Sequence, residues 1–169
     1  MRPWLLVLVA ALTMTTKAEA VSLMNATACG RAILESYEQK RFPRELVDVN
    51  AIITRAVGAD MRRLSREQKS LVFSVAQHLL KESFEQPEEE YEFRDLDVTY
   101  VERTRRGYRA TGTVFIRSTD YTGTVNFMAL NSGLGCTVYQ VRIADWTSLD
   151  ASLRAKLRRH PRTRGLIGR

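Results

Sequence analysis

The hydrophobic spacing of this chain changes at residues 85–92, and this change most constrains its fold. Before this stretch, apolar residues recur every three or four positions, as on one face of a helix. After it, they alternate with polar residues, as in strands that bury one face. The stretch itself holds five glutamates and a proline, so we expect a solvated connection. Helices followed by strands predict an α+β domain.

Three helices are predicted ahead of the connection, together covering about residues 22–84. They span residues 22–40, 49–61 and 66–84. Asp48 is a suitable N-cap for the second helix. Ser65 and Gln68 have the spacing of a capping box, in which each side chain accepts from the other residue's backbone N–H. The third helix has a wide apolar stripe, which indicates burial on more than one side.

Four alternating runs predict a sheet over about residues 95–145. They are residues 96–100, 108–116, 125–129 and 139–143. Gly107, Gly123 and Gly133 mark the reversals between them, so the sheet is expected to be an antiparallel meander. Thr147 or Ser148 can then cap a final helix that ends near residue 159.

The C-terminal segment, residues 148–169, combines this helix with a basic tail. From Arg154 onwards it holds eight basic residues, counting a protonated His160, and no acidic residue. Such a segment attracts phosphate groups on lipid headgroups or nucleic acid. A solvated helix face with a frayed end is the alternative, and the sequence leaves both open.

The N-terminus has the features of a secretory signal peptide. Arg2 precedes an apolar run over residues 4–14, and the small-residue pattern Ala18-Glu19-Ala20 follows. The run is too short for a bilayer, which needs about 20 apolar residues. We expect cleavage near Ala20 and one exported, basic domain over residues 21–169; a retained N-terminal anchor is the alternative. An exported protein seldom meets nucleic acid, so no nucleic-acid partner is expected.

Export also bears on the two cysteines, Cys29 and Cys136. An oxidising compartment allows them to form a disulfide. In the chain-entropy model, closing so long a loop contributes about 4 kcal/mol. Two buried free thiols are the alternative.

Few residues suggest catalysis or metal binding. His78 and His160 are the only histidines, neither lies in a motif, and no His, Cys, Asp or Glu cluster has metal-ligand spacing. We therefore predict no catalytic residue, no cofactor and no metal. Asp97, Asp120 and Asp145 fall at or near the sheet, where burial in a cavity would raise a carboxyl pKa towards values suited to proton transfer. Solvation at turns and strand ends is the simpler interpretation.

Two blocks of residues carry a family resemblance. The first comprises Val47-Asp48-Val49, Val57-Gly58, Leu64 to Gln68, Phe73, Leu79-Leu80 and Phe84; the second comprises Val138 to Ile143, Ser148-Leu149 and Gly165-Leu166-Ile167. In order and spacing they resemble the MlaC family, periplasmic auxiliary components of toluene-tolerance-type ABC transporters. Gln140 departs from the family's usual aspartate.

The resemblance implies a periplasmic, non-enzymatic carrier with phospholipid as its cargo. Its implied partners are an MCE-domain protein of an inner-membrane ABC transporter and an outer-membrane lipoprotein assembly, and its implied role concerns outer-membrane lipid asymmetry. The corresponding architecture is NTF2-like, with an apolar cavity between helices and sheet.

Periodicity alone fits a packed core and a hollow one equally well. For a hollow core, we predict a cavity between the apolar face of the sheet and the second and third helices. Its predicted lipid-binding residues are Ile53, Val57, Leu71, Val75, Leu79, Val114, Ile116, Phe127 and Val141.

Two other functions remain open. A small cavity enzyme of the ketosteroid-isomerase type would place a buried carboxylate or tyrosine facing the cavity. A basic envelope adaptor without a ligand would have a filled core, and its binding to an acidic partner would weaken with salt.

Overall fold

The computed structural model describes residues 23–168, except residues 89, 106, 133–134 and 144–147 and the side chains of residues 128, 130–132 and 135–136. The predicted signal peptide lies outside the described residues. After a helix over residues 23–38, the elements are α2 (Val49–Val57), the 3-10 helix η1 (Gly58–Arg62), α3 (Arg66–Glu85), β1 (Phe93–Thr104), β2 (Gly107–Ile116), η2 (Arg117–Thr119), β3 (Tyr121–Ser132), β4 (Gly135–Ile143) and α4 (Leu149–Arg159).

This arrangement confirms the predicted α+β fold, with N-terminal helices, a four-stranded antiparallel sheet and a C-terminal helix. The strand order is β1-β2-β3-β4, a meander. Strand β1 is much longer than the predicted run 96–100, because alternation reveals only the part of a strand that buries one face. The end of β1 from Thr99 to Thr104 has no buried side chain, so its pairing with β2 leaves no such pattern in the sequence.

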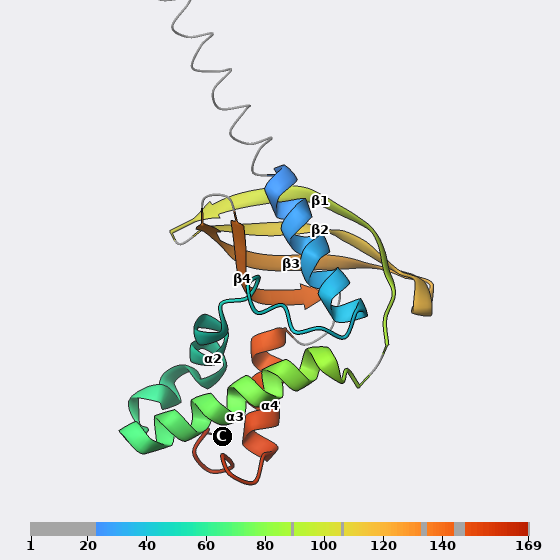
Figure 1. Cartoon of the computed structure of the whole chain (residues 1–169). Coiled ribbons are helices and arrows are strands. Elements are labelled where there is room, and N and C mark those ends of the chain that lie inside the picture. Colours follow the sequence, from blue (N-terminus) through green and yellow to red (C-terminus); the bar gives the residue numbers. More distant parts are fainter. Residues whose placement is uncertain (1–22, 89, 106, 133–134, 144–147, 169) are drawn as a thin grey trace, which may run out of the picture.

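The helices form two groups around the sheet (Figure 1). The helix over residues 23–38 lies across one face of the sheet, whereas α2, α3 and α4 pack together beyond the β4 edge. The segment before α2 also covers that edge, because the backbone N–H of Val138 donates to Leu46 at 2.7 Å and Asp48 donates back to Val138 at 2.8 Å. At Val138, the β4 edge is therefore not free to pair with another chain.

Gly30 allows the helix over residues 23–38 to lie close to the sheet. A Cβ at this position would be only 2.9 Å from both Leu96 Cδ2 and Phe127 Cε1. Any larger side chain would therefore push the helix outward or displace the Phe127 ring, which is only 2% exposed.

The starts of α2 and α3 follow the predicted local signals. Ser148 lies at the N-cap position of α4, as predicted, but its side chain makes no capping hydrogen bond, and one helix end also differs from the prediction. Asp48 accepts from the backbone of Ala51 at 2.8 Å, and Ser65 with Gln68 forms the complete capping box. The predicted helix over residues 49–61 was too long: α2 ends at Val57, because Gly58 takes a positive φ of 60° and a 3-10 turn follows. Within the described part of the chain, no helix has the length and apolar character to cross a bilayer.

Candidate ligand-binding cavity

A cavity of about 550 Å³ lies where the first helix, the end of α3, β4 and α4 meet. Its walls include Ile33, Leu34 and Tyr37 from the first helix, Ser83 and Phe84 from α3, Pro87, Glu88 and Tyr91 from the connection, Phe93 from β1, Val141 and Ile143 from β4, and Leu149, Ser152 and Lys156 from α4. Most of these side chains are apolar or aromatic, so the walls suit an apolar ligand.

One wall of the cavity is aromatic. The ring of Tyr37 lies 5.8 Å from Phe93, 6.4 Å from Phe84 and 6.5 Å from Tyr91, measured between centroids. Phe42 supports this wall from behind, with its ring 5.7 Å from Phe84. Edge-to-face and offset contacts of this kind give aromatic clusters a defined geometry. The wall is therefore built by side chains that hold one another in place.

Polar contacts bring the connection after α3 to the end of the first helix. The backbone N–H of Phe93 donates to the carboxylate of Glu38. Lys40 forms an ion pair with Glu90 on the connection. These contacts hold Tyr91 and Phe93 against Tyr37, so the acidic connection carries two aromatic side chains into the cavity wall.

The polar side chains of the lining gather on another side. Lys156 Nζ on α4 donates to Ser83 Oγ at 3.2 Å and lies 3.4 Å from Glu88 Oε1. The side chain of Glu88 is 83% exposed, whereas that of Lys156 is 23% exposed. This side of the cavity therefore opens to solvent, with an ammonium group at its edge.

A second space of about 10 Å³ lies between the first helix and the sheet. Gly30, Ile33, Leu34, Val125, Phe127, Val138 and Val141 line it. It shares Ile33, Leu34 and Val141 with the larger cavity, so these three side chains separate the two. Such a space has room for about one water molecule at most, so it does not extend the larger cavity towards the sheet.

The structure separates most of the nine predicted lining residues from the cavity. Val141 lines both spaces, and Phe127 lines the smaller one. The other seven line neither: Ile53, Val57, Val75, Leu79, Val114 and Ile116 are buried in the core, and Leu71 is partly buried against it. Periodicity identifies the side chains that face inward, but it does not show where a cavity remains between them. Their contact with a lipid stays a prediction.

The predicted position of the cavity needs a corresponding correction. The larger cavity lies against the first helix and α4, and α2 contributes nothing to its walls. Helix α3 contributes only its C-terminal end, through Ser83 and Phe84. The physical reason is that α2 and α3 pack with α4 beyond the β4 edge and do not cover the face of the sheet (Figure 1).

Sequence reasoning missed the aromatic wall and Lys156. One signal for the wall was present, because Tyr91 and Phe93 are aromatic residues in an otherwise charged stretch. For Lys156 no such signal exists. It is one of several basic residues in its segment, and only the fold brings it to Ser83.

The predicted carboxylate and histidine candidates do not converge on a site. Asp97 and Asp120 are exposed and line neither space, and Asp145 lies outside the described residues. His78 is exposed and His160 is half-buried. Among the described residues, no three His, Cys, Asp or Glu side chains are grouped to hold a metal ion. Cys29 is buried in the core and disulfide-bonded, but the side chain of Cys136 is outside the description, so its role as the partner stays a prediction.

Comparison with known proteins gives a likeness in structure but no match in sequence. No protein-family model matches the sequence, and no curated protein matches it. The fold is similar to a solved structure of a phospholipid-binding protein from Ralstonia solanacearum in complex with a phospholipid. The two chains are 15% identical, with a TM-score of 0.49 over 89% of this chain and 88% of the other. At this distance, a ligand for the present chain has to be inferred from its own cavity.

Proposed function

We propose that this protein is a non-enzymatic carrier that holds phospholipid acyl chains in the cavity between its first helix, β4 and α4. The observation that carries this proposal is an open cavity of about 550 Å³ that is lined mainly by apolar and aromatic side chains. Sites for small ligands have volumes of about 300–1,000 Å³ and similar walls. In this proposal, the headgroup remains in water at the solvent-exposed side of the cavity, next to Glu88.

Acyl chains need no covalent bond or cofactor to be held in such a space. Each methylene transferred from water to an apolar wall contributes about 0.8 kcal/mol. A few buried methylenes therefore give useful affinity, and the interaction is reversible, as a carrier requires.

The side chains of the cavity favour a carrier over a cavity enzyme. Glu88 is the one carboxylate among the described lining residues, and it is largely exposed, so no described lining residue offers a buried carboxylate for proton transfer. Tyr108, whose pKa is raised by burial, is not part of the lining. The cavity also favours a carrier over an adaptor with a filled core.

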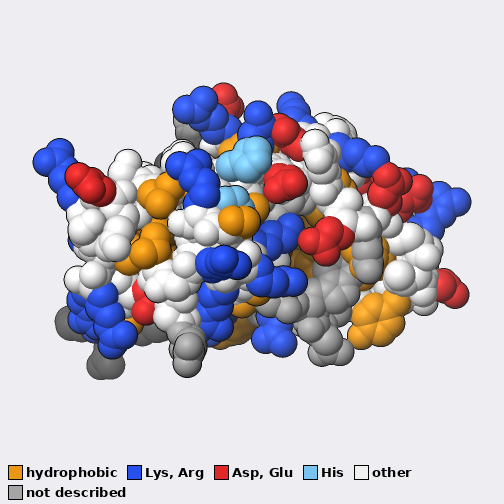
Figure 2. Space-filling model, turned by 90° about the horizontal axis from the view of Figure 1, so that it is seen from below, with side chains coloured by type: hydrophobic (Ala, Val, Ile, Leu, Met, Phe, Trp, Pro, Cys, Tyr) orange, Lys and Arg blue, Asp and Glu red, His pale blue; other side chains and the backbone are white. Residues whose placement is uncertain are grey.

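We further propose that the carrier is exported to the periplasm and exchanges lipid with membrane complexes, including an MCE-domain protein and an outer-membrane lipoprotein assembly. The signal-peptide pattern and the two sequence blocks that resemble the MlaC family support this proposal. The exposed Arg158, Arg159, Arg162 and Arg164 add positive charge that suits anionic headgroups. Figure 2 shows Lys and Arg side chains spread over the face that carries the helices.

Native mass spectrometry of the mature protein tests the carrier function. The protein is purified from an envelope fraction without detergent, and bound lipid is extracted and identified. We expect co-purified phospholipid with about one molecule per chain, the occupancy that one cavity of this size predicts. A mass equal to that of the polypeptide, unchanged after incubation with phospholipid vesicles, would contradict the proposal.

A further inference from the structure

Lys156 occupies an unusual place in the cavity. It lies on the same face of α4 as Leu149 and Ser152, since residues spaced three, four and seven apart share a helix face. That face turns apolar Leu149 towards the cavity and ends in the ammonium group of Lys156. The side chain is 23% exposed, so its charge sits at the boundary between the apolar walls and water.

Ser83 holds this ammonium group in position. The Ser83 hydroxyl donates its own proton to the carbonyl of Leu79 at 2.8 Å. Its oxygen is therefore left to accept from Lys156 Nζ, at 3.2 Å. A lysine ammonium has three N–H donors, so two remain for other acceptors.

Glu88 is a weak partner for Lys156. Its carboxylate lies 3.4 Å from Nζ, but its side chain is 83% exposed on the connection after α3. Ion pairs that are this accessible to water contribute little. A phosphate group carries negative charge on several oxygens, and it can take the place of Glu88 without breaking the Ser83 contact.

We infer that Lys156, positioned by Ser83, binds the phosphate group of the lipid headgroup at the mouth of the cavity, where the phosphate replaces Glu88. The inference rests on the proposed carrier function and adds to it a specificity for lipids that bear a phosphate. Acyl chains against the apolar walls place the headgroup at this edge, and Ser152 supplies a second hydroxyl on the same face of α4.

The test is competition between two lipids that differ only in the headgroup. The mature protein is incubated with vesicles that contain equal amounts of phosphatidylglycerol and a diacylglycerol with the same acyl chains, and native mass spectrometry gives the ratio of the two bound lipids. We expect wild type to prefer phosphatidylglycerol. Lys156→Gln should lower the bound ratio about tenfold, the size expected for losing one hydrogen bond to a charged group.

Two further variants separate this role from others. Lys81→Gln makes the same substitution at a lysine of α3, but Lys81 is exposed and outside the lining, so the ratio should not change. Glu88→Gln should raise the ratio, because it weakens the group that competes with phosphate. A fall after Glu88→Gln would overturn the inference, since it would show that the ion pair itself shapes the cavity.

Free phosphate is a different source of the same chemistry. Inorganic phosphate added during loading should leave the wild-type ratio unchanged, because it lacks the acyl chains. If it lowers the ratio to that of Lys156→Gln, the site binds free phosphate and the headgroup assignment is overturned.

Failure of this inference is distinguishable from failure of the carrier function. If wild type takes up neither lipid, the carrier function fails, and the inference with it. If wild type takes up both lipids without preference, or Lys156→Gln keeps the wild-type ratio, the headgroup inference alone fails.

Discussion

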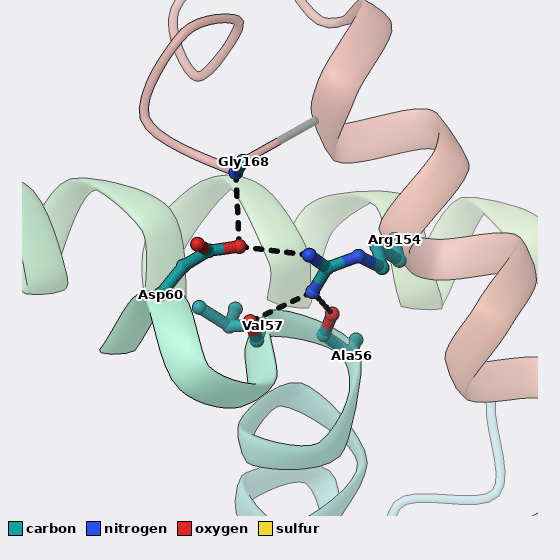
Figure 3. A network of polar contacts seen from close by, with 5 residues as sticks. All are labelled: Ala56, Val57, Asp60, Arg154 and Gly168. Carbon is teal, nitrogen blue, oxygen red and sulfur yellow. Dashed lines mark hydrogen bonds and ion pairs between the residues drawn. The ribbon is translucent and has the colours of Figure 1, made fainter. Parts of the chain in front are cut away.

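The guanidinium of Arg154 lies 2.8 Å from the carboxylate of Asp60, and this ion pair ties α4 to the 3-10 turn after α2 (Figure 3). The same guanidinium donates to the carbonyls of Ala56 and Val57, each at 2.8 Å, and so satisfies the C-terminal end of α2. The backbone N–H of Gly168 donates to the same Asp60 oxygen at 2.9 Å. One carboxylate therefore holds a helix and the end of the described chain together.

Asp60→Asn should lower the free energy of unfolding by about 1–3 kcal/mol, because the partly buried Arg154 would lose its charged partner. Denaturant unfolding at neutral pH measures this change. Glu102→Gln is the control, since the pair of Glu102 with Arg109 is about half exposed and should contribute under about 1 kcal/mol. Equal effects of the two substitutions would contradict a special role for Asp60.

The same carboxylate predicts a pH dependence of stability. The backbone N–H of Gly168 and the guanidinium of Arg154 hold the pKa of Asp60 below its ordinary value of 3.8. A lowered pKa in the folded state contributes stability above the unfolded pKa, and this contribution is lost as pH falls through the folded value. We expect the free energy of unfolding to fall more in wild type than in Asp60→Asn when the pH is lowered from 5 to below 3.8. Parallel curves for the two proteins would refute the linkage.

Gly112→Ala should destabilise the sheet. A Cβ at Gly112 would lie 2.1 Å from the backbone carbonyl oxygen of Asp97, where the register between β1 and β2 shifts. Because the obstacle is backbone, relief requires movement of a strand, and we expect a loss of about 1–3 kcal/mol. Thermal or denaturant unfolding measures it, with Thr113→Ala at the neighbouring exposed position as control.

Val141→Phe should reduce lipid binding without unfolding the protein. Val141 is half-buried and lines the cavity, so a larger side chain takes up space for the ligand. Excluding about two methylenes from the cavity corresponds to an affinity at least about tenfold lower. Lipid per protein is measured by native mass spectrometry. Val101→Phe, at a half-buried valine of β1 outside the lining, should bind lipid normally; equal loss in both variants would argue against this cavity.

Replacing Arg158, Arg159, Arg162 and Arg164 together by Gln should weaken association with vesicles containing phosphatidylglycerol. Each basic residue near an anionic surface contributes up to about 1 kcal/mol, so we expect at least a tenfold loss at low salt. Vesicle co-sedimentation over a range of salt concentrations measures this. The control replaces four exposed arginines near the sheet, Arg103, Arg105, Arg109 and Arg117. An equal loss in the control would indicate a general effect of net charge.

Local signals in the sequence were enough to predict the elements and their order. Asp48 and the Ser65–Gln68 pair act within one helical turn, and their hydrogen bonds form as expected. Alternation likewise located the four strands, because it depends only on which side of a strand is buried. The end of α2 was not predicted, because the expected helix continues past Gly58, whereas this glycine takes a positive φ and ends α2.

The sequence by itself therefore determined the α+β class, the meander and the inward-facing residues. Only the tertiary structure decided where the core stays open. That depends on how closely the first helix approaches the sheet at Gly30 and on how far α4 stands from the aromatic wall around Tyr37. Likewise, Lys156 and Ser83 are 73 positions apart and meet only because α4 packs against α3. Periodicity records the direction of each side chain, whereas a cavity arises from distances between elements that no local pattern encodes.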